Sequence, residues 1–220
     1  MDIYSFKGYI FDLDGTLVES AHVWHQVDKE FLARRGFEVP EDYCRALAVM
    51  DFNMAAVYTK ERFGLPDSLE EIKDEWFSLA LDEYTNRIRT KPHAAEFLRS
   101  LKERGKRIAL ATASNVLLYS AVLKSNGIYD LFDAFVSTEE APRGKGFPDV
   151  YELAASRLGL SAGECVVFED IIEGIRGANA GGFATAAVLG GSYPEDEAAM
   201  QREAAVAFSD FAQITKNDDR

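Results

Sequence analysis

Short apolar segments recur along this chain and alternate with segments of helical periodicity, and this alternation limits the possible folds more than any other feature. Runs of this kind stand at Tyr9–Phe11, Arg107–Ala111, Ala134–Val136, Cys165–Phe168 and Ala184–Leu189. Because they are continuously apolar, they are typical of strands buried on both faces of a parallel sheet. Apolar residues with helical spacing lie between them, over residues 94–101, 117–122, 150–158 and 172–179. The pattern predicts an α/β fold with a doubly wound, Rossmann-like parallel sheet.

The interval 17–89 interrupts this alternation. Its apolar residues have helical spacing over 23–32, 55–63 and 69–84, and it shows no convincing strand. We therefore expect an α/β core formed by residues 1–16 and 90–220, with an inserted helical cap domain formed by residues 17–89. The aromatic residues Trp24, Phe52, Tyr58 and Trp76 are expected in the core of that cap, with the alternative that one or two of them line the substrate pocket. Open α/β sheets bind ligands at the carboxyl ends of their strands, so an insertion directly after the first strand is a candidate lid.

Charge and cysteine content narrow the choice of partners and compartment. The chain has 24 Lys and Arg against 37 Asp and Glu, a net charge of −13. Such an acidic chain is not expected to bind nucleic acid or anionic membranes, because polyanions attract clustered cations. Its two cysteines, Cys44 and Cys165, cannot form a disulfide framework and suit a reducing compartment. The first residues show no signal-peptide pattern, and no apolar run approaches the ~20 residues that span a bilayer. We expect a cytoplasmic monomer.

An acidic pair follows the first predicted strand, in Asp12-Leu13-Asp14-Gly15-Thr16. Side chains at i and i+2 of an extended segment point to one side, so Asp12 and Asp14 can lie together. Like charges this close repel each other, and Mg²⁺, which prefers carboxylate and carbonyl oxygens, would neutralise them. A solvated Asp-Gly turn would also produce this sequence. The position after a strand and before the insertion favours a functional site.

Thr112 follows the second predicted strand and leads into Ser114 and Asn115 at a predicted helix start. A hydroxyl group and free backbone N–H groups at such a place can bind an anion. Ser114 or Asn115 could instead be a plain helix cap.

Two further polar sites lie later in the chain. Lys145 stands between two glycines, where it could compensate the charge of a phosphate or be an ordinary surface lysine. Glu169 and Asp170 follow an apolar run, where they could be metal ligands or helix caps. All four sites are expected at the carboxyl ends of strands, hence at one edge of the sheet. Two acidic pairs, a hydroxyl and a lysine are the parts needed for phosphoryl transfer through an aspartyl intermediate.

In this order, Asp12-Leu13-Asp14-Gly15-Thr16, Thr112, Lys145 and Glu169-Asp170 resemble the four motifs of the haloacid dehalogenase superfamily of phosphotransferases. The insertion resembles the helical cap of that superfamily. The pattern is most similar to the β-phosphoglucomutase-like subfamily, and the resemblance spans essentially the whole chain.

The resemblance implies a role for each motif. Asp12 would attack phosphorus, and Asp14 would protonate the leaving oxygen and then activate water. Thr112 would bind the phosphoryl oxygens, and Lys145 would offset negative charge. Contacts to substrate or phosphate would come from Gly15, Thr16, Ser114 and Asn115. The ligands of Mg²⁺ would be Asp12, Asp14 through its backbone carbonyl, Glu169 and Asp170.

Some positions depart from the family pattern. Residues 48–53 contain no arginine where a β-phosphoglucomutase grips the second phosphate, and Phe52 stands nearest that position. Losing that cation would weaken the capture of a bisphosphate intermediate, so we favour a hydrolase over a mutase. The sequence thus predicts a Mg²⁺-dependent phosphatase acting on a small phosphorylated metabolite such as a sugar phosphate. The alternatives are a phosphomutase and a non-catalytic binding protein that retains the fold.

Overall fold

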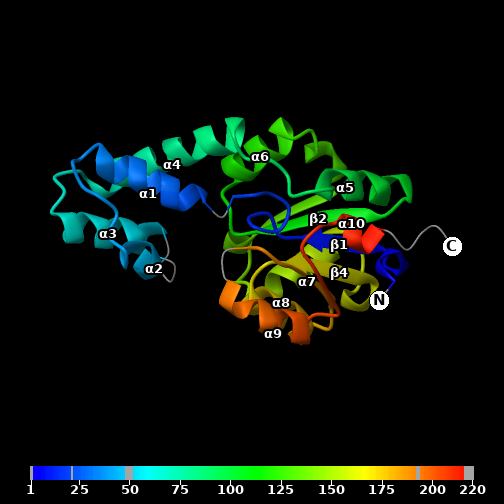
Figure 1. Cartoon of the computed structure of the whole chain (residues 1–220). Helices are drawn as coiled ribbons and strands as arrows, with labels where there is room; N and C mark the ends of the chain where they lie inside the picture. Colours follow the sequence, from blue (N-terminus) through cyan, green and yellow to red (C-terminus); the bar gives the residue numbers. More distant parts are fainter. Residues whose placement is uncertain (1, 21, 48–51, 192–193, 216–220) are drawn as a thin grey trace. The chain divides into compact units, whose positions relative to one another are not determined.

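A six-stranded parallel sheet, with strand order β3-β2-β1-β4-β5-β6, forms the centre of the computed structural model (Figure 1). Residues 2–20, 22–47, 52–191 and 194–215 are described. The strands are β1 Gly8–Phe11, β2 Arg107–Thr112, β3 Ala134–Ser137, β4 Cys165–Glu169, β5 Ala184–Val188 and β6 Val206–Phe208. The predicted α/β fold with a doubly wound parallel sheet is confirmed. The five expected strands are present, and β6 was missed because it is only three residues long.

Helices cover both faces of this sheet. They are α5 Ala94–Glu103, α6 Val116–Ser125, α7 Asp149–Arg157, α8 Ile172–Ala180, α9 Glu197–Glu203 and α10 Ala212–Thr215. Successive residues of a strand point to opposite faces, and β1 is buried on both. Ile10 packs in one cluster with residues of α7 and α8, whereas Phe11 meets Phe97 of α5 on the other side, with ring centroids 6.2 Å apart. Figure 1 shows α5 and α7 on opposite sides of the sheet.

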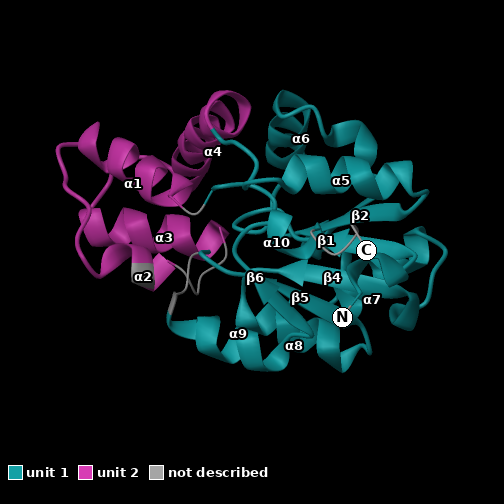
Figure 2. Ribbon diagram, turned by 45° about the vertical axis from the view of Figure 1, so that its right-hand side comes forward, with its two compact units in different colours: residues 1–21, 88–220 teal, residues 22–87 magenta. Residues whose placement is uncertain are grey.

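By compactness the chain divides into two units, residues 1–21 with 88–220 and residues 22–87 (Figure 2). The second unit is helical and contains α1 Val23–Ala33, α2 Tyr43–Leu47, α3 Phe52–Phe63 and α4 Leu69–Asn86. Helix α4 begins with a capping box, in which Ser68 and Glu71 satisfy each other's backbone N–H groups. The division lies a few residues from the limits 17 and 89 expected from the sequence.

The aromatic residues of the helical unit do not all belong to its core. Trp76 is buried and meets Phe31 at a centroid distance of 5.4 Å. Trp24 and Phe52, which were expected in the core, are 41% and 40% exposed. Their expected place in the core was wrong, because helical spacing identifies an apolar face without showing whether the unit covers it. The alternative that one or two of these aromatic residues line the substrate pocket stays a prediction.

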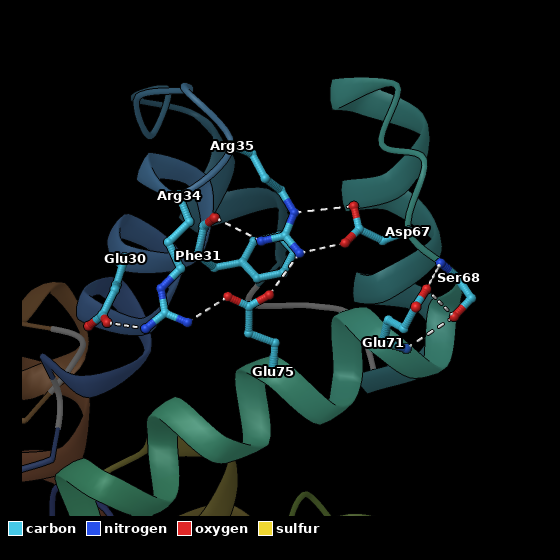
Figure 3. Close-up of polar contacts among 8 residues, drawn as sticks. All are labelled: Glu30, Phe31, Arg34, Arg35, Asp67, Ser68, Glu71 and Glu75. Carbon is cyan, nitrogen blue, oxygen red and sulfur yellow. Dashed lines mark hydrogen bonds and ion pairs between the residues drawn. The ribbon is translucent and has the colours of Figure 1, made fainter.

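A network of ion pairs joins the end of α1 to the start of α4 (Figure 3). Arg35 contacts Asp67 at 2.6 Å and Glu75 at 2.7 Å, and its guanidinium lies 3.7 Å from the centre of the Phe31 ring. Arg34 also reaches Glu75, at 2.8 Å. A cavity of about 520 Å³ lies beside these residues. The charged residues that line this cavity are paired with one another, so the network holds α1 and α4 together.

The structure can be compared with two expectations from the sequence, one about membrane-spanning segments and one about disulfide bonds. Within the described ranges, none of the helices combines the length and apolar character needed to cross a membrane. Cys44 and Cys165 are both free thiols.

Candidate active site

Three neighbouring strands bring the expected polar residues to one edge of the sheet. β1 lies between β2 and β4. Asp12 directly follows β1, Thr112 is the last residue of β2, and Glu169 is the last residue of β4. The backbone N–H of Asp12 donates to the carbonyl of Phe168 at 3.0 Å, so the ladder continues into the acidic segment. The site lies where the strand order reverses, which is where open α/β sheets bind ligands.

A buried cluster of carboxylates occupies this edge. Asp12, Glu169 and Asp170 each offer an oxygen, and these oxygens all lie within 4.8 Å of one another. Their residues are 4%, 0% and 5% exposed. Burial, together with the negative charge of Asp12, raises the pKa values of the Glu169 and Asp170 carboxyl groups. Three carboxyl groups so close together and so little hydrated require a compensating cation.

Lys145 supplies one positive charge to this cluster. Its Nζ forms ion pairs with Asp12 and, at 2.7 Å, with Glu169 Oε1. Burial alone would lower the pKa of Lys145, but the two carboxylates outweigh it and raise that pKa. The loop that carries Lys145 packs tightly on α8, where a Cβ at Gly177 would overlap the Lys145 carbonyl oxygen. The alternative of an ordinary surface lysine is therefore excluded.

The turn after Asp12 wraps around Asp170. Gly15 has φ +77°, in the region that favours glycine, and a Cβ there would overlap Asp170 Oδ2. The hydroxyl of Thr16 donates to Asp170 Oδ1 at 3.3 Å. Gly15 and Thr16, which the resemblance assigns to phosphate contacts, thus contact the second acidic pair in this structure.

Asp14 has different surroundings from Asp12. Its carboxylate lies outside the cluster of three, and Oδ1 accepts a hydrogen bond from the hydroxyl of Ser20 at 2.7 Å. Asp14 is also partly exposed, whereas Asp12 is buried. The sequence contained no signal for Ser20, because its contact with Asp14 depends on how the chain turns between residues 14 and 20.

The residues after β2 form a helix start. Thr112 is fully buried, and its Oγ1 accepts the N–H of Ser114 at 2.9 Å. Asn115 is the N-cap of α6, since its Oδ1 accepts the N–H of Leu117 at 2.9 Å. Of the two alternatives, capping is thus confirmed for Asn115. The hydroxyl proton of Thr112 is not used in its bond with Ser114 and is free to be donated elsewhere.

Two residues beside the acidic cluster were missed at the level of sequence. Tyr151 of α7 donates from its hydroxyl to Glu169 Oε1 at 2.8 Å. Lys91 is 7% exposed, its Nζ lies 3.4 Å from the carbonyl oxygens of Leu189 and Gly190, and burial lowers its pKa. Tyr151 belongs to a helical apolar pattern and Lys91 precedes a proline, so neither has a sequence context that indicates an active site.

The donor set fits a divalent cation. Glu169 Oε2 is buried and, among the described residues, has no hydrogen-bond partner. Glu169, Asp12 and Asp170 each offer a carboxylate oxygen to the same cluster, and hard cations such as Mg²⁺ prefer an oxygen-only set of this kind. These three residues could therefore hold a metal ion, while Lys145 neutralises part of the remaining charge.

A parallel α/β sheet with a buried acid–lysine cluster at its switch point defines the chain as an enzyme of the α/β class. The family model described as haloacid dehalogenase-like hydrolase matches residues 6–182. The chain therefore belongs to the haloacid dehalogenase-like hydrolases, and the resemblance inferred from its motifs is confirmed.

Individual relatives agree with this assignment. Hexitol phosphatase A of Escherichia coli (strain K12) is 33% identical over 171 residues, which cover 77% of this chain and 76% of that protein. The crystal structure of CbbY from Rhodobacter sphaeroides in complex with phosphate matches with a TM-score of 0.80 at 21% identity, covering 95% and 96% of the two chains. A putative β-phosphoglucomutase from Thermotoga maritima matches with a TM-score of 0.79 at 23% identity, covering 92% and 94%. At these identities the two structures support the fold.

Proposed function

We propose that this protein is a Mg²⁺-dependent phosphatase that hydrolyses a small phosphorylated metabolite, with sugar and polyol phosphates as the leading class. The observation that carries this proposal is the buried pairing of Lys145 with Asp12 and Glu169 beside Asp170. Family membership supports phosphomonoester hydrolysis. The name of one relative, hexitol phosphatase A, supports the substrate class.

Asp12 is the proposed nucleophile. One of its carboxylate oxygens attacks phosphorus, a P–O bond to Asp12 forms, and the P–O bond to the substrate alcohol breaks. Lys145 contacts Asp12 directly. It therefore holds this carboxylate in place, and it offsets the negative charge that an incoming phosphate brings.

Asp14 is the proposed acid and base. It gives its proton to the oxygen of the leaving alcohol, and in the second step it takes a proton from the water that attacks the phosphoaspartate. That water then breaks the bond between phosphorus and Asp12, which releases inorganic phosphate and restores both residues. Ser20 holds Asp14 through the bond to Oδ1, and the partial exposure of Asp14 suits a group that exchanges protons with substrate and water.

Phosphate would be held by groups near the start of α6. Thr112 has a hydroxyl proton to donate, and Ser114 and Asn115 bring the N-terminus of that helix close by. Gly15 and Thr16 would complete the pocket from the turn after Asp12. Mg²⁺, when bound by Asp12, Glu169, Asp170 and the backbone carbonyl of Asp14, would supply positive charge to the transferring phosphoryl group.

The helical unit is proposed as the cap. Its insertion point, between β1 and the rest of the sheet, places its connections next to the acidic turn. Closure over the substrate would exclude water during phosphoryl transfer and contribute specificity. The monomeric state and the cytoplasmic location stay predictions from the sequence.

A phosphate-release screen tests the proposal. Sugar phosphates, polyol phosphates and nucleotides are incubated with the wild-type protein in Mg²⁺ or in EDTA, and with the variants Asp12→Asn and Asp130→Asn. Asp130 is an exposed carboxylate that is not among the proposed site residues, and it serves as the matched control. We expect release that requires Mg²⁺, is lost in Asp12→Asn and persists in Asp130→Asn. Turnover by Asp12→Asn at the wild-type rate would overturn the mechanism.

The same assay separates a hydrolase from a mutase. The preference for a hydrolase over a mutase rests on residues 48–53, of which 48–51 lie outside the described residues. β-Glucose 1-phosphate is supplied together with a bisphosphate activator. Stable conversion to the 6-phosphate would support a mutase, whereas release of inorganic phosphate supports the hydrolase.

A further inference from the structure

Glu169 Oε1 receives two hydrogen-bond donors from one short segment. Lys145 reaches it at 2.7 Å and Tyr151 at 2.8 Å. Lys145 lies in the loop just before α7, and Tyr151 lies in the first turn of that helix. Loop and helix therefore hold this oxygen from two directions, which leaves Oε2 as the carboxylate oxygen without a partner among the described residues.

We infer that Tyr151 is a positioning residue of the metal site, whose hydroxyl fixes the orientation of Glu169 and thereby raises the affinity of the site for Mg²⁺. This inference rests on the proposed function, which makes Glu169 a metal ligand. Tyr151 itself contacts neither substrate nor metal in this account.

The aromatic ring of Tyr151 is held firmly. Tyr151 is fully buried, in a cluster with Ile10 and Val167 of the sheet. Its ring meets Phe183 edge-on, with centroids 6.3 Å apart. Only the hydroxyl reaches the polar cluster, so the sheet and α7 together determine where that hydroxyl lies. A rigid apolar ring carrying one polar atom is well suited to fix a carboxylate.

The hydroxyl of Tyr151 is a donor in this contact. A carboxylate oxygen can only accept, so the phenol O–H supplies the proton of the 2.8 Å bond to Glu169 Oε1. Donation to an ionised carboxylate is a charge-assisted hydrogen bond, stronger than one between neutral groups.

Lys145 cannot replace Tyr151 in this role. Its Nζ is shared between Asp12 and Glu169. Without the tyrosine hydroxyl, Glu169 would depend on a cation that the nucleophile also needs, and its carboxylate would be free to rotate. Partners that orient metal ligands typically contribute about 10–100-fold to metal affinity.

The chain contains a matched control for this inference. Tyr9 of β1 is also fully buried, and its hydroxyl donates to the carbonyl of Ile3 at the same distance of 2.8 Å. Tyr9→Phe and Tyr151→Phe therefore each remove one buried hydroxyl and its 2.8 Å hydrogen bond, and Tyr9→Phe also removes a longer contact of 3.4 Å to the carbonyl of Phe6. Tyr9 meets Phe97 on the face of the sheet opposite to Ile10, away from Glu169.

The experiment compares wild type, Tyr151→Phe and Tyr9→Phe. Isothermal titration calorimetry measures the dissociation constant of Mg²⁺ without substrate. Thermal unfolding is recorded in EDTA, and phosphate release is measured as a function of Mg²⁺ concentration. We expect both variants to lose a similar amount of thermal stability. Only Tyr151→Phe should bind Mg²⁺ more weakly, by about 10-fold or more, with most of kcat recovered at saturating Mg²⁺.

Two results would contradict the inference in distinguishable ways. Wild-type affinity and wild-type Mg²⁺ dependence in Tyr151→Phe would overturn the role of Tyr151 and leave the proposed function intact. If the wild-type protein neither binds Mg²⁺ nor hydrolyses phosphate esters, the proposed function fails and the inference fails with it.

Discussion

Replacing Lys145 by methionine should destabilise the metal-free protein strongly. The lysine side chain is 10% exposed, and its partners Asp12 and Glu169 are 6% and 0% exposed. Removing one partner of a buried ion pair leaves an uncompensated buried charge, which costs about 3–5 kcal/mol. Methionine has a similar volume and flexibility, so packing changes contribute little to this figure.

The loss should depend on pH. Burial raises the pKa values of Glu169 and Asp170 in the folded, metal-free protein. A carboxyl group with a raised pKa in the folded state contributes stability that is complete below its unfolded pKa of about 4 and is lost as the pH rises through the folded value. The cost of Lys145→Met is therefore largest at alkaline pH and shrinks as the pH falls through about 8 and 7, the raised pKa values at which Glu169 and Asp170 take up protons.

Urea unfolding in EDTA measures this cost, with Lys7→Met as the control. Lys7 pairs with Glu164 at 2.8 Å, but both side chains are exposed, at 70% and 36%. Exposed ion pairs contribute little, so Lys7→Met should unfold almost like the wild type. Added Mg²⁺ should restore part of the stability of Lys145→Met, because binding to the folded state alone stabilises it. Equal unfolding free energies for Lys145→Met and Lys7→Met at about pH 8 would refute the reasoning.

Two further substitutions test local features. Gly15→Ala should reduce activity by about 10²-fold, since a displacement of the order of 1 Å in a site costs that much and the new Cβ would overlap Asp170. Gly36→Ala, with φ +79° and nothing within 4 Å of its Cβ, imposes the same backbone strain and should leave kcat unchanged. Equal kcat values for the two variants would show that the overlap with Asp170 does not affect activity. Burial raises the pKa of Asp28 to about 7, so its contribution to stability is complete below about pH 4 and is lost as the pH rises through about 7. Asp28→Asn should remove about 4 kcal/mol of this pH dependence. Urea unfolding at several pH values measures it. If the unfolding free energies of Asp28→Asn and the wild type change equally with pH, Asp28 ionises normally in the folded state.

Five of the strands could be predicted because a strand that is buried on both faces has a continuously apolar sequence. Strands such as Cys165–Glu169 are covered on both faces and therefore read as continuous apolar runs. β6, Val206–Phe208, lies at the edge of the sheet with two of its three residues only half-buried. The apolar run that contains it, Ala204–Phe208, is rich in alanine and does not by itself distinguish a strand from a helix.

In the candidate site, too, some features could be predicted from the sequence and others could not. Asp12 and Glu169 could be placed at one edge because each stands at the end of an apolar run, and their oxygens do lie within 4.8 Å of each other in the structure. The partners of these acids could not be foreseen in the same way. Tyr151 and Ser20 acquire their contacts from the packing of α7 and from the turn after β1, and tertiary packing of this kind has no local sequence pattern.

The central claim is that Asp12 carries the phosphoryl group during turnover. It is tested by rapid acid quenching of the enzyme during hydrolysis of its best substrate, followed by peptide mass spectrometry. The account predicts a phosphoryl group on the peptide that contains Asp12, formed with Mg²⁺ at the rate of turnover and lacking in Asp12→Asn. Full turnover with an unmodified Asp12, or a phosphoryl group on another residue, would contradict it.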